Sequence, residues 1–251
     1  MNEAVTANGA PHSPEQLADR GDARGSVLQT AVRSPGRPTK ARRGAEPFDA
    51  LLWRLQSKQA ASHGDANTLG LIGCEADAGA TTIAANLAVR ASELGLGPVL
   101  LVETDCERPR LRNVWKLAPG PGLAEALAGE AALGDCLYAG PAPELQVIPA
   151  SAGKRRDLAA WDTSAIDALL AEISADHNLV VFDLPCADRL NRATLIARRL
   201  DQVLLVVRAE HSRGPATRRA ADRLLEDGIP LSGAVLNRRR AYVPRLLRRW
   251  I

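Results

Sequence analysis

The stretch that decides the fold runs Thr68-Leu-Gly-Leu-Ile-Gly-Cys-Glu-Ala-Asp-Ala-Gly-Ala-Thr-Thr-Ile-Ala-Ala-Asn-Leu-Ala88. An apolar run, a loop of small residues and a second apolar run with helical spacing predict a strand, a loop and a helix in that order. This arrangement places backbone N–H groups and a helix N-terminus at the carboxyl end of the strand, where they favour phosphate oxygens. The stretch therefore predicts a phosphate-binding loop between Gly73 and Thr82. In the common form of this loop a lysine contacts the phosphates, and this chain has Ala80 at that position.

The composition favours one α/β domain with flanking segments. The chain has 251 residues, of which 46% are hydrophobic and only 3% aromatic, so that Ala, Leu, Val and Ile must build the core. Its four cysteines contain no Cys-x-x-Cys pair, which is typical of neither a zinc site nor a disulfide framework and favours a reducing compartment. No apolar stretch approaches the roughly 18 residues needed to cross a bilayer. We therefore expect a cytoplasmic protein that does not span the membrane.

Both ends of the chain are rich in arginine, although the formal net charge is only +3. Residues 1–44 lack periodicity and predict a disordered basic arm, for which a solvated state is favoured over contact with nucleic acid or acidic lipid. Residues 45–65 carry apolar side chains at helical spacing and predict an amphipathic docking helix. Residues 241–251 form a basic amphipathic tail, and we expect this tail to contact an anionic membrane or a partner groove.

Residues 66–240 alternate between strand-like and helix-like patterns. The run from 178 to 183 is almost purely apolar, as expected for a parallel strand covered on both faces. The alternation predicts an α/β fold with a doubly wound, mainly parallel sheet, in which ligands bind outside the carboxyl ends of the strands. The expected strands are 68–73, 98–103, 145–149, 178–183, 202–207 and 231–236, and the expected helices are 81–94, 110–116, 122–128, 162–175, 192–199 and 213–227.

Acidic residues follow two of these strands at the same edge of the sheet. Glu103, Asp105 and Glu107 lie at the end of the second strand and in the loop after it, and Asp183 ends the strand 178–183. In nucleotide hydrolases and kinases, such acids hold Mg²⁺ directly or through its waters and position the attacking group. A strand-end acid can also cap a helix or stay solvated, but several acids in register with a phosphate loop favour a site. We therefore expect catalytic roles for Glu103, Asp105 and Asp183.

Four segments together resemble one protein family. The loop Ala76-Asp-Ala-Gly-Ala-Thr-Thr82 stands where that family commonly has Pro-Gly-Glu-Gly-Lys-Ser-Thr, and Leu100-Leu-Val-Glu-Thr-Asp-Cys-Glu-Arg-Pro109 stands where it has Leu-Leu-Val-Asp-x-Asp-x-Arg-Arg-Pro. The segments 121–130 and 145–153 resemble two further family stretches that carry no general nucleotide chemistry. Over residues 46–240 the chain thus resembles the bacterial tyrosine kinases of polysaccharide co-polymerase systems, the cytoplasmic P-loop proteins that govern capsule and exopolysaccharide assembly.

The resemblance implies a P-loop NTPase fold of the deviant Walker type that binds ATP or ADP with Mg²⁺. It assigns nucleotide binding to Gly73, Gly79, Ala80, Thr81, Thr82 and Asn237, the last of which would contact the adenine. It assigns the metal to Thr81, Asp105 and Asp183. It also implies an inner-membrane co-polymerase or chain-length protein as partner, self-association, and a peripheral location at the inner membrane.

The departures from the family pattern fall mostly on catalytic positions. With Ala80 in place of the lysine, a charge-assisted contact worth about 1.5 to 3 kcal/mol is lost. By analogy with the loss of a single oxyanion-stabilising donor, the rate of phosphoryl transfer should fall by about a hundred- to a thousandfold. Glu103 is one methylene longer than the usual aspartate, and Glu107 reverses the usual arginine charge. Only Tyr138 and Tyr242 are present, so the family's tyrosine cluster is absent. We therefore expect weak nucleotide binding and impaired phosphoryl transfer.

Three functions are consistent with this pattern. The leading hypothesis is a cytoplasmic regulator or scaffold of exopolysaccharide or capsule synthesis and export, descended from a tyrosine autokinase. The second is an active tyrosine autokinase or ATPase in which Lys154, Arg108 or a partner's arginine replaces the lysine. The third is a positioning ATPase of the division-site or partitioning type, which shares the fold. Those proteins carry a second lysine early in the phosphate loop, whereas this chain has no lysine between Lys58 and Lys116.

Overall fold

The computed structural model describes residues 46–59, 67–151 and 161–238. The basic arm predicted at 1–44, the basic triplet Lys154-Arg-Arg156 and the tail predicted at 241–251 lie outside these residues. Within them, no helix is long and apolar enough to cross a membrane.

A seven-stranded sheet with the order β3-β4-β2-β5-β1-β6-β7 forms the centre of the molecule. All neighbouring strands pair in parallel except β3, which pairs antiparallel with β4. The prediction of a doubly wound, mainly parallel α/β sheet is confirmed. The strands are β1 Asn67–Gly73, β2 Val99–Glu103, β3 Tyr138–Ala139, β4 Leu145–Ile148, β5 Leu179–Leu184, β6 Gln202–Arg208 and β7 Leu231–Asn237.

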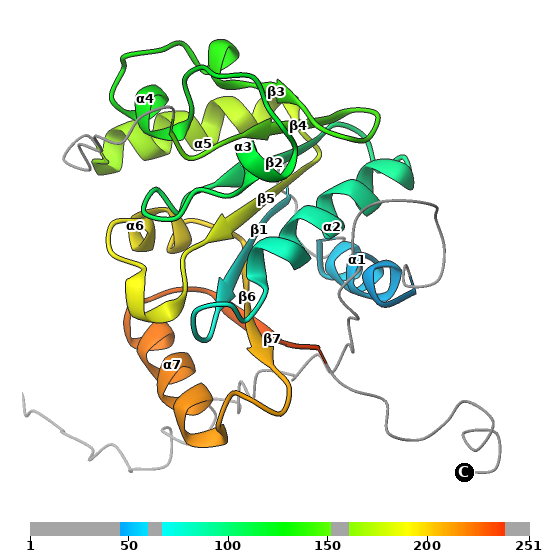
Figure 1. Cartoon of the computed structure of the whole chain (residues 1–251), viewed down its shortest axis with the longest axis vertical. Coiled ribbons are helices and arrows are strands. Elements are labelled where there is room, and N and C mark those ends of the chain that lie inside the picture. The colour runs from blue at the N-terminus through cyan, green and yellow to red at the C-terminus, as the bar shows by residue number, and fades with distance from the viewer. Residues whose placement is uncertain (1–45, 60–66, 152–160, 239–251) are drawn as a thin grey trace, which may run out of the picture.

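Helices cover both faces of the sheet (Figure 1). The helices are α1 Glu46–Gln59, α2 Ala80–Glu93, α3 Leu111–Val114, α4 Leu123–Leu127, α5 Thr163–Asp176, α6 Ala193–Ala197 and α7 Gly214–Glu226, with 3₁₀ turns η1 Leu133–Cys136 and η3 Ala187–Arg189. Side chains of α1, α2 and α3 pack on one face, and side chains of α4 to α7 pack on the other. Because successive strand residues point to opposite faces, Leu69 and Leu71 of β1 join the first core while Ile72 joins the second.

The helix α1 lies against α2 through the buried side chains Phe48, Leu51 and Leu52. An ion pair between Asp49 and Arg90, with 2.5 Å between Oδ1 and Nε, joins the two helices beside this apolar contact. Residues 45–65 were expected to form a docking helix, and the described helix occupies 46–59 of that range.

The expected elements differ from the observed ones mainly at their ends, by one or two residues. The strand β3 and the two 3₁₀ turns were not expected. β3 has only two residues, of which Tyr138 is half-buried and Ala139 exposed, so that it has no apolar alternation from which a strand could be predicted. It adds one antiparallel edge to a sheet that is otherwise parallel.

Candidate functional site

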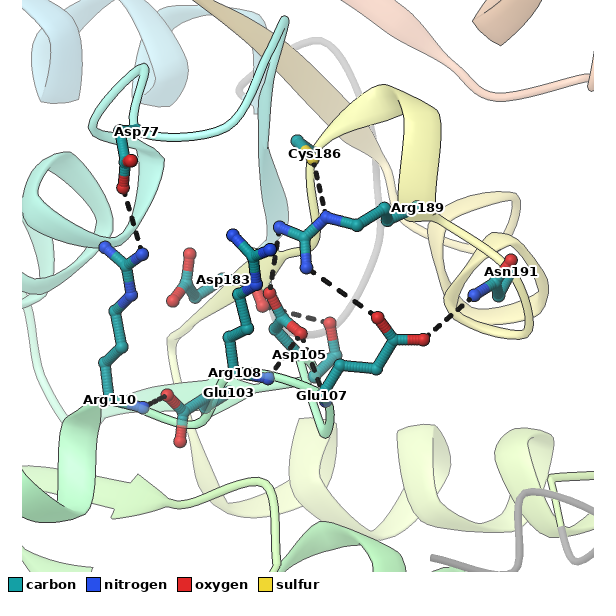
Figure 2. A network of polar contacts seen from close by, with 11 residues as sticks. Asp77, Glu103, Asp105, Glu107, Arg108, Arg110, Asp183, Cys186, Arg189 and Asn191 are labelled. Carbon is teal, nitrogen blue, oxygen red and sulfur yellow. Dashed lines mark hydrogen bonds and ion pairs between the residues drawn. The ribbon is translucent and has the colours of Figure 1, made fainter.

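The carboxyl ends of β1, β5 and β2 bring three loops together at one edge of the sheet. β5 lies between the other two strands, and Asp183 of β5 is in register with Leu71 of β1 on one side and Glu103 of β2 on the other. Figure 2 shows the acids of this edge beside three arginines, Arg108, Arg110 and Arg189. The structure therefore assembles the loop after β1, the predicted acids and these arginines in one place.

The loop after β1 has the backbone of a phosphate-binding loop. Gly79 is in the left-handed region, with φ of +98°, and α2 begins at the next residue. The first N–H of α2 with a backbone acceptor is that of Ile83, which donates to the Gly79 carbonyl at 3.0 Å. In the described part of the chain, the N–H groups of Ala80, Thr81 and Thr82 have no acceptor, as the first turn of any helix requires. They are available to an anion.

Ala80 gives this loop no charge. Its side chain is only 9% exposed and packs in the apolar core formed with α1 and α2. Thr81 is half-buried and Thr82 exposed. Gly73 ends β1, where a Cβ atom would lie 2.9 Å from the carbonyl oxygen of Glu75. The cradle predicted from the sequence is therefore present in its backbone, while the position of the missing lysine is part of the core.

Asn237 fastens this loop to the end of β7. Its Nδ2 donates to the Ala78 carbonyl at 2.8 Å, and its Oδ1 accepts from the backbone N–H of Arg238 at 2.8 Å. The side chain is only 1% exposed. An adenine contact was expected for Asn237, and the observed contacts of its carboxamide are with the backbone of the loop and of its own strand end.

Asp183 is a buried carboxylate with one unpaired oxygen. The residue is 2% exposed, the Thr81 hydroxyl hydrogen-bonds to it, and its Oδ1 has no hydrogen-bond partner among the described residues. Burial, and then the neighbouring charge of Glu103, raise the pKa of Asp183 well above its ordinary value. An unpaired carboxylate oxygen beside a threonine hydroxyl and a phosphate loop fits Mg²⁺, which is commonly held by one or two carboxylates, by waters and by substrate phosphates.

Glu103 is occupied by the backbone. Its Oε1 accepts from the N–H groups of Arg110 at 2.5 Å and Leu111 at 3.0 Å, and its Oε2 accepts from the N–H of Ala150 at 3.2 Å. Burial raises the pKa of Glu103 above its ordinary value, and these three donors lower it only in part. The carboxylate thus joins β2 to the start of α3 and to the loop after β4. Its extra methylene, compared with the family aspartate, lets it reach all three donors.

Asp105 shapes the loop after β2. Its Oδ1 accepts from the backbone N–H groups of Glu107 at 3.2 Å and Arg108 at 3.0 Å, and its Oδ2 lies 3.7 Å from a guanidinium nitrogen of Arg189. Asp105 is partly exposed at the site, whereas Glu103 and Asp183 are buried. Of the three predicted acids, Asp105 is therefore the one that a ligand can reach most directly.

Sequence reasoning missed the partners of these acids. Arg189 of η3 donates from Nε to the Cys186 sulfur at 3.2 Å and lies 3.8 Å from the Glu107 carboxylate, to which Asn191 also donates at 3.3 Å. Arg110 lies 3.0 Å from Asp77 of the phosphate loop. Glu107 gives no signal of this partner in the sequence, because an exposed glutamate can stay solvated, and the turn that contains Arg189 has no pattern of its own.

Three cysteines, Cys74, Cys106 and Cys186, lie in the loops at this edge. All four cysteines are buried, and none forms a disulfide with another described residue. Burial raises the pKa of the Cys74 thiol. Within residues 46–59, 67–151 and 161–238, no three His, Cys, Asp or Glu side chains are grouped as a metal site.

Comparisons with known proteins agree with the fold and the motifs. No family model matches the chain. The tyrosine-protein kinase CpsD of Streptococcus agalactiae is 23% identical over 201 residues, which are 79% of this chain and 84% of CpsD. The kinase domain of the Escherichia coli tyrosine kinase ETK has a TM-score of 0.72 with 21% identity, over 94% of this chain and 98% of that domain.

A second class of solved structures shares the fold. The septum site-determining protein MinD of Pyrococcus horikoshii, complexed with Mg-ADP, has a TM-score of 0.60 with 24% identity, over 72% of this chain and 75% of MinD. The phosphate loop and the acids at the sheet edge are thus set in a P-loop NTPase fold. With the long match to CpsD and the shared fold, these motifs make the chain similar to the bacterial tyrosine kinases, with an altered phosphate-binding loop.

Proposed function

We propose that the protein is a cytoplasmic regulator or scaffold of exopolysaccharide or capsule synthesis and export, built on a tyrosine-kinase framework that is impaired in phosphoryl transfer. The observation that carries the proposal is the burial of Ala80, an uncharged residue, in the phosphate loop. Its side chain is buried in the apolar core at the position where the family places a lysine on the phosphates. The fold and the loop backbone are retained, while the charged group that acts on the transferred phosphate is missing.

The second altered position supports the same reading. Glu103 stands where the family has its first catalytic aspartate, and both of its oxygens accept backbone hydrogen bonds. A carboxylate engaged in this way is poorly placed to accept a proton from a substrate hydroxyl, because general base catalysis requires a free acceptor within hydrogen-bond reach. A structural role at this position fits a protein that keeps the framework without the chemistry.

The residues that remain would bind a nucleotide weakly. The N–H groups of the first turn of α2 would hold phosphate oxygens, and Thr81, Asp105 and Asp183 would hold Mg²⁺, which neutralises phosphate charge when bound. The partners that fit this role are an inner-membrane polysaccharide co-polymerase or chain-length protein, a second copy of the chain, and an anionic membrane contacted by residues 241–251. Such contacts would place the protein at the periphery of the inner membrane.

Phosphate transfer from radiolabelled ATP tests the impairment. We expect the purified full chain to label neither itself nor a tyrosine substrate above the level of Asp105→Ala, with or without the membrane partner. Ala80→Lys should raise transfer or ATP affinity, whereas Ala80→Met, which has similar length and no charge, should not. Labelling of the wild-type chain that Asp105→Ala abolishes would instead establish an active autokinase. The charge of Arg108, which helps to lower the pKa of Asp77 in the phosphate loop, is the observation that favours that alternative.

Deletion of the gene tests the biological role. We expect loss or a changed chain length of surface polysaccharide, restored equally by the wild-type gene and by Asp105→Ala, because a scaffold does not need the reaction. Restoration by the wild-type gene alone would show that catalysis is required. A defect in DNA segregation or septum placement with normal polysaccharide would indicate a positioning ATPase, whose fold the chain shares.

A further inference from the structure

An arginine from the loop after β2 forms an ion pair with the phosphate loop. Arg110 lies just before α3, and its guanidinium nitrogen is 3.0 Å from the Oδ1 of Asp77 in the loop after β1. Figure 2 shows the side chain extending from the β2 loop toward the phosphate loop. The strand order places β5, with Asp183, between these two loops. The guanidinium therefore connects the loop after β2 to the loop after β1 at the edge of the sheet where the site lies.

Asp77 is an unusual residue for this loop. It has a φ of +60°, in the left-handed region, at the position where the family motif has a glycine. Its carboxylate is mostly exposed, at the rim of a loop whose N–H groups favour anions. A fixed negative charge there repels a phosphate. The hydrogen bond from Arg110, and then its charge, lower the pKa of Asp77, so that the carboxylate is ionised and paired.

The backbone of Arg110 is held in place by hydrogen bonds to Glu103. Its backbone N–H donates to the buried Glu103 carboxylate at 2.5 Å, and the N–H of Leu111 donates to the same oxygen. The positive charge of Arg110 also acts on Asp183, the buried acid that is hydrogen-bonded to Thr81. The backbone of Arg110 is thus held by Glu103, while its guanidinium pairs with Asp77 of the phosphate loop and its charge acts on Asp183.

We propose that Arg110 binds the nucleotide phosphate in place of the missing lysine. When no nucleotide is bound, the Asp77 carboxylate pairs with the Arg110 guanidinium instead. The proposal rests on the nucleotide binding contained in the proposed function. The ligand class is a nucleoside di- or triphosphate, since a guanidinium pairs with phosphate as it does with a carboxylate. Binding exchanges the Asp77 carboxylate for a phosphate oxygen and breaks no covalent bond.

A double-mutant cycle on nucleotide affinity tests the exchange. Calorimetry with the full chain, Mg²⁺ and ADP or ATP gives Kd for the wild type, Arg110→Ala, Asp77→Asn and the double variant. We expect Arg110→Ala to weaken affinity by about ten- to a hundredfold and Arg110→Lys by less, since lysine keeps the charge. Asp77→Asn should tighten affinity by about three- to tenfold, through release of Arg110 and loss of repulsion. In the Arg110→Ala background, the part of this gain that comes from releasing Arg110 should disappear.

A matched ion pair elsewhere provides the control. Arg199, in the turn after α6, pairs with Asp167 of α5 through its guanidinium, and its side chain is 25% exposed against 48% for Arg110. Arg199→Ala and Asp167→Asn should leave nucleotide affinity unchanged. Adenosine, which has no phosphate, should bind all variants equally, and thermal melts should show that each variant is folded.

Two results would overturn the proposal. An unchanged Kd in Arg110→Ala, or a gain in Asp77→Asn that is equally large with and without Arg110, would show that nucleotide binds but that the pair is only structural. Absence of binding at millimolar nucleotide in every variant, including Asp77→Asn, would remove the nucleotide from the proposed function as well. The scaffold role would still be judged separately, by surface polysaccharide in the deletion strain.

Discussion

The Nδ2 of Asn237 donates to the carbonyl oxygen of Ala78 at 2.8 Å, so that the phosphate loop is held by the last strand of the sheet. This contact leaves no room for a side chain at the next residue. A Cβ atom added to Gly79 would lie 2.2 Å from the same Nδ2, and the φ of +98° at Gly79 disfavours any other residue.

Gly79→Ala should therefore destabilise the protein by about 1 to 3 kcal/mol, from backbone strain and from displacement of Asn237. Asn237→Ala in the same chain should recover the part caused by the clash and leave the part caused by φ. Urea denaturation of the two single variants and the double variant measures both parts. Gly134→Ala is a suitable control, because an added Cβ there meets nothing within 4 Å. Equal stability of Gly79→Ala and the wild type would contradict the prediction.

Glu103→Asp should destabilise the protein even though it restores the family residue. An aspartate is one methylene too short to keep all three backbone donors, and a lost hydrogen bond to a buried charged group costs about 1 to 3 kcal/mol. Glu130→Asp, at an exposed position, should change stability by less than about 0.5 kcal/mol. A Glu103→Asp variant that is as stable as the wild type and gains phosphoryl transfer would show that Glu103 is a catalytic residue and not a structural one.

Asp183 should make the protein less stable as pH rises. Its pKa is raised in the folded state, so between the ordinary value near 4 and the folded pKa the native state binds more protons than the unfolded state. By linkage, the free energy of unfolding falls through this window and levels off above the folded pKa. The Asp183→Asn variant has no carboxyl group to titrate at this position. Its free energy of unfolding, relative to that of the wild type, should therefore increase from pH 4 upward. A difference between the two that is constant from pH 4 to 8 would refute this explanation.

Glu107→Arg, which restores the family charge, should cost about 0.5 to 1 kcal/mol, because it places two arginines together beside Asp105. The double variant Glu107→Arg/Arg189→Glu should recover only part of the loss, since the new glutamate then faces Asp105. Chemical denaturation at low salt and in 1 M salt measures the effect, which salt should reduce by screening. A loss that is the same at both salt concentrations would mean that packing, and not charge, determines it.

The fold could be predicted from the sequence because its signals are local. The alternation of elements and the apolar run of β5 predict the type of sheet, and the small-residue loop before α2 predicts the edge at which the site lies. Ala80 was recognised as the lysine position because the surrounding residues kept their spacing. Its burial in the core, however, is a tertiary property that the local sequence does not show.

The contacts within the site could not be predicted in the same way. Glu103 was expected to be catalytic, because the sequence shows that an acid ends β2 but not that three N–H groups converge on it. Arg110 and Asp77 are 33 residues apart in the sequence. They follow β2 and β1, and the order β2-β5-β1, which brings the loops after these strands to one edge, was not predicted from the sequence. The roles expected for all the site residues stay predictions, namely those of Gly73, Gly79, Ala80, Thr81, Thr82, Glu103, Asp105, Asp183 and Asn237.

The unpaired oxygen of Asp183 has a consequence for the life of the protein in the cell. A folded chain in which a buried carboxyl oxygen has no partner opens more often than one in which both oxygens are paired, and proteases degrade the open form. Any cation that binds at this carboxylate stabilises the native state according to its concentration. If a cation binds there, we expect turnover to become a second output of the site, because an empty molecule would be removed sooner than an occupied one even if no phosphate is ever transferred.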